Sequence, residues 1–161
     1  MRRMFFVLVA FFFLLIASCK KDNQVAPTSF FMEAKLNGSN WAGQPYTGYA
    51  GDDSLHIQAR LPNTQDNIAF VIKYNGTANY QLKGSQSTFY ILDASNVDIC
   101  DYKMDPSFNN HISITAFDAT TKIASGNFEV HFVRAYGIST YADKLDFVNG
   151  TFRAQLPVNL H

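Results

Sequence analysis

Apolar and polar residues alternate with a period of two along most of the chain after Ser29. The clearest window is 54–61, whose odd-numbered positions are apolar and whose even-numbered positions are polar. Alternation of this kind is typical of a strand with one face in the core and the other in water. The pattern therefore predicts a half-buried strand here, and it recurs further along the chain.

Other short segments show strand character and are separated by residues that favour turns. Segment 68–74 is apolar on both faces except at Lys73, which predicts a central strand. Asn37-Gly38 and Asn75-Gly76 predict turns. No window carries a sustained helical stripe with caps. The remaining predicted strands are 30–36, 80–82, 89–92, 111–117, 128–133, 145–147 and 152–156.

This spacing of short strands predicts an all-β fold. Strands that recur every 8–12 residues or so, with Gly and Asn between them, are typical of antiparallel sandwiches and barrels. We predict a single antiparallel β-sandwich over 29–161, with a closed or partly closed calycin-like β-barrel as the alternative. Phe70, Ile72, Phe128 and Phe132 are expected in its core. Trp41 is expected to plug the core beneath the first turn.

Two strings of the C-terminal half resemble each other. They read Ser125-Gly126-Asn127-Phe128 and Asn149-Gly150-Thr151-Phe152, and each puts a glycine two residues before a phenylalanine expected to face inward. A glycine at such a place predicts a bulge or bend in the strand.

Tyrosines gather in two segments that read as long loops, 42–53 and 134–143. The candidate ligand-binding residues are Tyr46, Tyr49, Tyr136 and Tyr141. Tyrosine presents an apolar face and a polar tip, which suits stacking on a sugar or on a protein partner. If the two loops meet at one end of the sheet, the four rings would form a binding platform. The alternative is that they cap the ends of the β core.

The first residues of the chain have the pattern of an export signal. Arg2 and Arg3 precede an unbroken apolar run of 14 residues, Met4–Ala17. A membrane-spanning helix needs about 20 apolar residues, so this run fits a signal sequence better. The string Ile16-Ala17-Ser18-Cys19 follows. It resembles the lipobox of bacterial lipoproteins, which is a branched apolar residue, two small residues and a cysteine.

The lipobox resemblance implies a division of the chain into three parts. Residues 1–18 would be removed as a lipoprotein signal peptide, and Cys19 would be lipidated. Residues 19–28 would form the lipidated cysteine and its tether, and 29–161 the β domain. Lys20 stands where an Asp would resemble an inner-membrane retention signal, so the outer membrane is expected. The sequence leaves open whether the domain faces the periplasm or the cell surface.

Charge and cysteine content limit the partners. Without Arg2 and Arg3 the chain keeps 11 Lys and Arg against 13 Asp and Glu, so it offers no basic field for nucleic acid. Cys100 is then the only cysteine besides Cys19, which excludes an intramolecular disulfide. The flanking Asp98 and Asp101 disfavour a thiolate at Cys100, so a buried, unreactive thiol is expected.

Catalytic and metal-binding motifs are missing from the sequence. The histidines are His56, His111, His131 and His161, and none has a partner at metal-ligand spacing. His56 and His131 are expected on faces in water. Asp52-Asp53 and the group Asp98, Asp101 and Asp105 read as solvated turn carboxylates rather than calcium ligands. Gly-x-Ser-x-Gly and Ser-x-x-Lys are absent. We expect no catalytic residue, no metal and no cofactor.

The chain resembles a family of small, uncharacterised bacterial lipoproteins. Three stretches carry the likeness besides the lipobox: Ala34-Lys35-Leu36-Asn37-Gly38-Ser39-Asn40-Trp41, the hairpin 112–128, and Asn149-Gly150-Thr151-Phe152. The resemblance implies an all-β single domain and supplies no catalytic residue. The expected function is a membrane-anchored, non-catalytic binding module for an envelope protein or glycan. The alternative is a lipocalin-like carrier of a small apolar ligand.

Overall fold

The structure, a computed structural model, describes residues 29–49, 54–61 and 65–157. These residues form no helix long and apolar enough to cross a membrane. The strands are β1 (Phe31–Leu36), β2 (Ser39–Tyr49), β3 (Ser54–Arg60), β4 (Asp66–Lys73), β5 (Ala78–Gln81), β6 (Ser87–Leu92), β7 (Asp98–Met104), β8 (His111–Asp118), β9 (Ile123–Gly137) and β10 (Lys144–Gln155).

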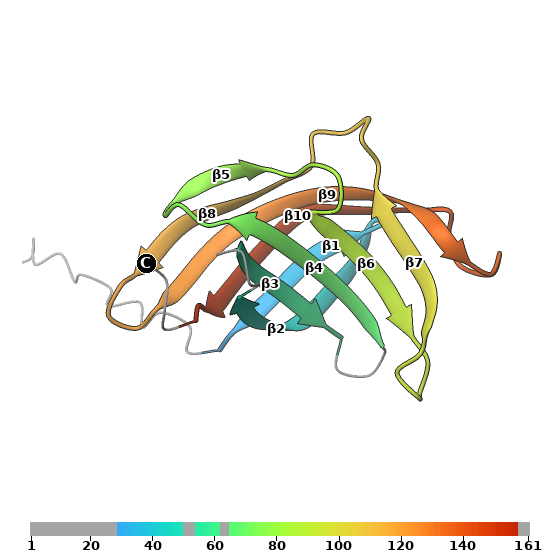
Figure 1. Cartoon of the computed structure of the whole chain (residues 1–161), viewed down its shortest axis with the longest axis horizontal. Coiled ribbons are helices and arrows are strands. Elements are labelled where there is room, and N and C mark those ends of the chain that lie inside the picture. The colour runs from blue at the N-terminus through green and yellow to red at the C-terminus, as the bar shows by residue number, and fades with distance from the viewer. Residues whose placement is uncertain (1–28, 50–53, 62–64, 158–161) are drawn as a thin grey trace, which may run out of the picture.

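All ten strands belong to one antiparallel sheet (Figure 1). Its order is β10-β1-β2-β3-β4-β6-β7-β9-β8-β5, and β10 also pairs with β9, which closes a ring of eight strands. β8 and β5 continue the sheet outside this ring. The all-β antiparallel prediction is confirmed, and the ring is consistent with a sandwich or with a partly closed barrel.

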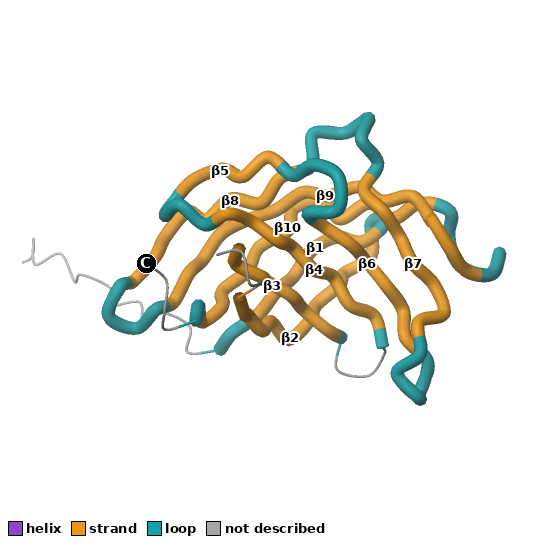
Figure 2. Tube along the Cα trace, in the orientation of Figure 1, coloured by secondary structure: helices purple, strands orange, loops and turns teal. Residues whose placement is uncertain are grey.

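The sheet divides along one edge of β9. The C-terminal part of β9 pairs with β7, from Phe132 opposite Met104 to Gly137 opposite Cys100. Its N-terminal part pairs with β8, and β5 lies beyond β8. Two connections cross this division, the β5–β6 turn (82–86) and the β7–β8 loop (105–110). Figure 2 shows both as teal segments close to each other above the orange strands.

Turn chemistry fixes the first hairpin as the sequence predicts. Asn37 and Gly38 join β1 to β2, with φ values of 48° and 83°. Positive φ at both central residues is the mark of a type I′ turn, whose twist matches that of the flanking strands. The Asn37 side chain also ties the turn to β10, because its Oδ1 accepts from the Asp146 N–H at 2.8 Å and its Nδ2 donates to the Lys144 carbonyl at 3.2 Å.

Aromatic side chains fill the interior of the ring. Phe89 lies at the centre of this group, with ring centroids 5.4 Å from Phe147, 5.7 Å from Tyr102 and 6.3 Å from Phe132. Trp41 packs edge-on against Phe147 at 5.3 Å, which confirms its prediction as a core residue. The four residues predicted to be buried, Phe70, Ile72, Phe128 and Phe132, are at most 2% exposed.

The two similar strings lie on neighbouring strands, and the glycine of each pairs with the phenylalanine of the other. Gly126 of β9 pairs with Phe152 of β10, and Gly150 of β10 pairs with Phe128 of β9. A Cβ on Gly150 would come within 2.7 Å of the Phe128 ring, and one on Gly126 within 2.7 Å of the Phe152 ring. Register shifts occur beside both glycines, so the predicted irregularity is confirmed. The glycines leave the space that the two rings occupy.

Four sequence expectations about elements are wrong. Residues 42–49, expected to start one long loop, belong to β2, and residues 134–137, expected to start the other, belong to β9. Asp98–Met104 forms β7, which the alternation did not predict. In β8 the alternation of Ile112, Ile114 and Ala116 predicts all three on the inner face, but the register shifts between Ile114 and Ala116 and leaves Ala116 exposed. The extra residue at a bulge reverses the side on which the following side chains point.

Several sequence predictions concern residues outside the described part of the chain. These are the signal 1–18, the lipidated Cys19 with its tether 19–28, Asp52-Asp53 and His161.

Candidate functional site

The four predicted tyrosines differ in position and exposure. Tyr46 and Tyr49 lie on β2 and are 47% and 40% exposed, and Tyr136 near the end of β9 is 63% exposed. Tyr141 lies in the β9–β10 loop and packs, partly buried, against the core. Three of the rings are therefore accessible to a ligand in principle.

A binding platform of these tyrosines requires that their two segments meet at one end of the sheet, and the strand register shows where Tyr49 and Tyr136 lie. Partner residues can be followed across the sheet from β9 to β2. From Tyr136 they are Asp101, Tyr90, Asn67, Arg60 and finally Gln44. Gln44 is at the opposite end of the paired part of β2 from Tyr49, which pairs with Leu55. The four tyrosines therefore do not form one platform.

Tyr46 has another partner, which the sequence did not indicate. Its hydroxyl shares a hydrogen bond with that of Tyr90 on β6. Burial, and then the neighbouring Tyr90, raise the pKa of Tyr46 above its ordinary value. Ala69, on β4 between their strands, is only 7% exposed. The tyrosine pair lies over the outer face of the ring.

The predicted carboxylate group is divided between two places. Asp98 and Asp101 lie on β7 rather than in a turn, where burial and the nearby Asp98 raise the pKa of Asp101. Asp105 lies at the far end of β7, in the β7–β8 loop. No group of three or more potential metal ligands occurs in the described ranges. Cys100 is buried as expected, and burial raises the pKa of its thiol.

A pocket of 620 Å³ opens where the sheet divides. It lies between the β5–β6 turn and the β7–β8 loop, and the ends of β6 and β7 form its floor. We call it the Lys83–Lys103 pocket. Its lining residues are Gln81, Leu82, Lys83, Gly84, Ser85, Ser87, Thr88, Lys103, Met104, Pro106, Phe108 and Asn110. Volumes of about 300–1,000 Å³ are usual for sites that bind small ligands.

Asn110 joins the two connections beside this pocket to each other and to β9. It is 2% exposed, and its Oδ1 accepts from the His131 N–H at 2.7 Å while its Nδ2 donates to the Asp105 carbonyl at 2.8 Å. Its own carbonyl accepts from the Leu82 N–H at 2.9 Å and from Gln81 Nε2 at 2.7 Å. One buried side chain and its backbone thus connect the β7–β8 loop to β9 and to the β5–β6 turn.

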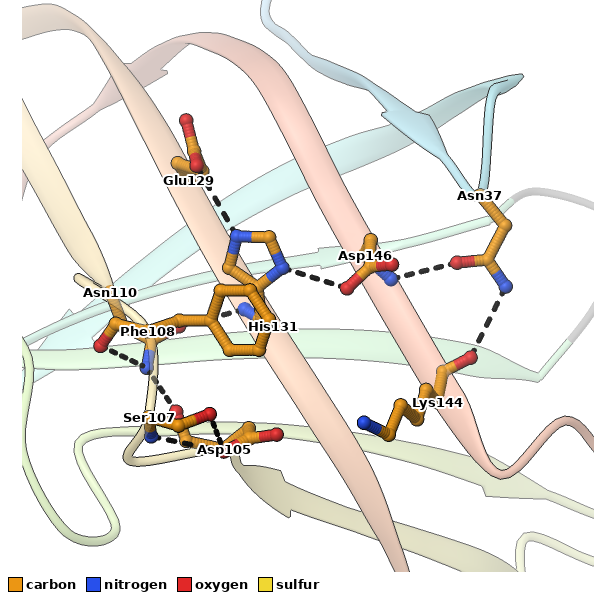
Figure 3. A network of polar contacts seen from close by, with 9 residues as sticks. All are labelled: Asn37, Asp105, Ser107, Phe108, Asn110, Glu129, His131, Lys144 and Asp146. Atoms are coloured by element: carbon orange, nitrogen blue, oxygen red, sulfur yellow. Dashed lines mark hydrogen bonds and ion pairs between the residues drawn. The ribbon is translucent and has the colours of Figure 1, made fainter.

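His131 supports the same loop from behind, at the centre of a polar cluster (Figure 3). Its Nδ1 lies 2.7 Å from Asp146 Oδ1 and its Nε2 lies 3.2 Å from Glu129 Oε1. The Phe108 ring stacks on the imidazole with a centroid distance of 4.0 Å. The expectation that His131 faces water is wrong, because the β7–β8 loop covers it and leaves it 8% exposed.

Asp105 shapes the start of the loop. Its Oδ1 accepts from the Ser107 hydroxyl at 2.6 Å and from the Ser107 N–H at 3.0 Å. These two bonds, the hydroxyl first, lower the pKa of Asp105 below its ordinary value. The carboxylate is therefore used within the loop, beside the pocket, and is not among the residues that line it.

The side chains around His131 and in the pocket differ in what they leave free. The His131 and Asp146 pair has the spacing of a catalytic dyad, but Glu129 occupies the second ring nitrogen and Phe108 covers the ring. A general base needs a free nitrogen within reach of a substrate. The pocket itself offers two ammonium groups, hydroxyls, amides and an apolar side, which are groups that hold a ligand in place.

Comparison of the chain with protein-family models, with curated proteins and with solved structures finds no match. The site therefore has to be interpreted from its own residues. The sequence gives no signal for the pocket, because its two lysines are 20 positions apart and belong to no motif.

Proposed function

We propose that this chain is a lipid-anchored protein of the bacterial cell envelope that binds an envelope glycan or protein in the Lys83–Lys103 pocket without catalysing a reaction. The observation that carries the proposal is the pocket, a concave site of suitable volume with polar groups around an apolar side. It lies on connections held by a rigid sheet, which is where binding residues are often found.

The filled interior supports an external site over the alternative of a lipocalin-like carrier. A carrier needs room inside the ring for its ligand. Here rings such as Phe70 and Phe128, with centroids 5.1 Å apart, occupy the interior. The engagement of both His131 nitrogens supports the non-catalytic part of the proposal.

The anchor is proposed from the sequence, with Cys19 as its attachment point and the outer membrane as its location. More than one acyl chain gives stable attachment, whereas a single chain is marginal. Cys19→Ser should move the protein from the membrane fraction to the supernatant of broken cells. A variant that stays in the membrane fraction until detergent is added would contradict the anchor.

Site-specific photo-crosslinking in growing cells tests the binding site. A photoreactive residue in place of Ser85, which is exposed and lines the pocket, should give an adduct with an envelope component. The matched control places the same residue at Thr120, which is also exposed and lies in the β8–β9 turn outside the pocket. Equal adducts at both positions, or none at Ser85, would overturn the proposed site.

A further inference from the structure

The lining of the pocket carries positive charge and no acid. Lys83 and Lys103 belong to it, and no Asp or Glu does. The chain has as many Asp and Glu as Lys and Arg, 13 of each, so a lining with two lysines and no acid departs from its composition. The nearest carboxylate along the chain, Asp105, is bound to Ser107.

Both ammonium groups lack a partner within the described residues. The ion pairs found there involve His131 and Arg134, not Lys83 or Lys103. No hydrogen bond of either lysine Nζ is found there. Lys103 is exposed on β7, opposite Thr88 of β6, and Lys83 is exposed at the start of the β5–β6 turn. Two unpaired cations at one pocket favour an anionic ligand.

The β5–β6 turn adds unpaired backbone donors. Gln86 closes the turn, since its Oε1 accepts from the Lys83 N–H at 2.8 Å and its own N–H donates to the Lys83 carbonyl at 3.1 Å. The N–H groups of Gly84 and Ser85 between them have no acceptor in the described part of the chain. Gly84 has a φ of 57°, and turns with such residues form concavities that bind anions.

The opposite side of the pocket is apolar and contains an aromatic ring. Phe108 and Pro106 come from the β7–β8 loop, and Phe108 is 44% exposed. One face of its ring is covered by His131, so only the remaining surface is open to a ligand. An aromatic surface beside polar donors suits a sugar ring, which has both C–H faces and hydroxyl groups.

We infer that the Lys83–Lys103 pocket binds an anionic saccharide. Its acidic group, a carboxylate, phosphate or sulfate, lies between Lys83, Lys103 and the Gly84 and Ser85 amides, and its ring contacts Phe108. This inference rests on the proposed binding function and narrows its ligand. A concave site of 620 Å³ suits a ligand of about two sugar rings, whereas a protein partner usually covers about 800 Å² of each surface.

Calorimetric titration of the purified full chain in detergent tests the inference. The probes are a disaccharide of hexuronic acids, a phosphorylated disaccharide, a neutral disaccharide of equal size and an acidic pentapeptide. We expect one or both acidic disaccharides to bind at least tenfold more tightly than the neutral one, with an affinity that falls as salt rises. The two acidic disaccharides distinguish carboxylate from phosphate recognition.

Variants connect that binding to the pocket. Lys83→Gln and Lys103→Gln should each weaken the acidic disaccharide about tenfold, because each removes one charged contact. The control Lys73→Gln changes an exposed lysine of β4 outside the pocket and should have no effect. Thermal unfolding of each variant checks that it folds like the unchanged protein.

Each other outcome overturns the inference in a defined way. If the neutral disaccharide binds as tightly as the acidic ones and neither lysine variant weakens it, the ligand does not need an acidic group. Binding of the pentapeptide alone identifies an acidic protein segment as the ligand. If no probe binds, the inference of a saccharide ligand is overturned. The photo-crosslinking experiment at Ser85 decides separately whether the pocket binds any envelope component.

Discussion

The ring interior and the Lys83–Lys103 pocket share β6 and β7 but differ in the polar groups that they leave unpaired. In the interior, facing glycines make room for phenylalanine rings, and the rings contact one another. At the pocket the ladder along β9 is interrupted, and two lysines and two backbone amides are left without partners in the described part of the chain. A closed antiparallel sheet uses up its backbone donors, so a site for a polar ligand arises where the sheet divides.

The largest expected effect is in the interior. Phe132→Ala removes a ring that is 1% exposed and should lower the free energy of unfolding by about 3–5 kcal/mol. Glu129→Ala changes the outer face of the same strand, where the side chain is 46% exposed, and should cost about 1 kcal/mol or less. Denaturant unfolding of the full chain measures both. Equal costs would mean that β9 does not separate a packed face from an outer one.

A second test addresses the glycines that admit the rings. A Cβ at Gly126 would lie 1.8 Å from the Ser113 carbonyl oxygen, so Gly126→Ala should cost about 3 kcal/mol of stability. Gly48→Ala is the matched control on β2, since nothing lies within 4 Å of its added Cβ. If both variants unfold at the same denaturant concentration, the β8, β9 and β10 strands are not packed as described.

Asn110 tests the connection between the two regions. Asn110→Ala leaves the His131 N–H without its acceptor and should cost about 2 kcal/mol. It should also weaken ligand binding, because it frees the β7–β8 loop. Asn109→Ala, at the exposed neighbouring position, is the control for both readouts. An Asn110 variant that binds and unfolds like the Asn109 variant would show that the loop does not depend on this side chain.

The smallest expected effect is a dependence on pH. The pKa of Asp105 is lowered from 3.8, chiefly by the Ser107 hydroxyl and then by the Ser107 N–H, with Lys144 and His131 as weaker contributors. A depressed folded-state pKa means that this contribution is complete above pH 3.8 and is lost as the pH falls through the lower folded value. The loop should therefore loosen in acid.

Asp105→Asn isolates that contribution, because it removes the titrating group and leaves Asp118, whose pKa is also lowered, in place. Between pH about 5 and 2, the thermal unfolding temperature should fall less steeply with decreasing pH in the variant than in the unchanged protein. Identical slopes would mean that the Ser107 bonds do not stabilise the folded state.

Local patterns predicted much of the ring. Alternation identified strands such as β3 and β4, and the Asn37-Gly38 turn followed from its dipeptide. β2 was missed because its Gly43 and Gly48 read as loop residues, although Trp41, Gly43 and Pro45 alternate on its buried side. Burial of Gly43 beside Ala59 is a property of the paired sheet, and the single strand does not reveal it.

The Lys83–Lys103 pocket could not be predicted from the sequence, for a different reason. The pocket depends on two connections that cross the division of the sheet, and this division depends on which strands pair with each half of β9. His131 alternates as a water-facing residue of β9, and only the β7–β8 loop buries it. Whether the tyrosine segments lie at one end of the sheet was open for the same reason, because the order of strands between Tyr49 and Tyr136 does not follow from their spacing.

The central claim, that ligands bind where the sheet divides, is tested most directly by following backbone amide signals by NMR during titration of the full chain in detergent with an acidic disaccharide. We expect saturable shifts at Gly84, Ser85, Lys103 and Phe108, and none at Gly126 inside the ring. Shifts centred on Tyr46, or no saturable shift at the Gly84 and Ser85 amides, would contradict it.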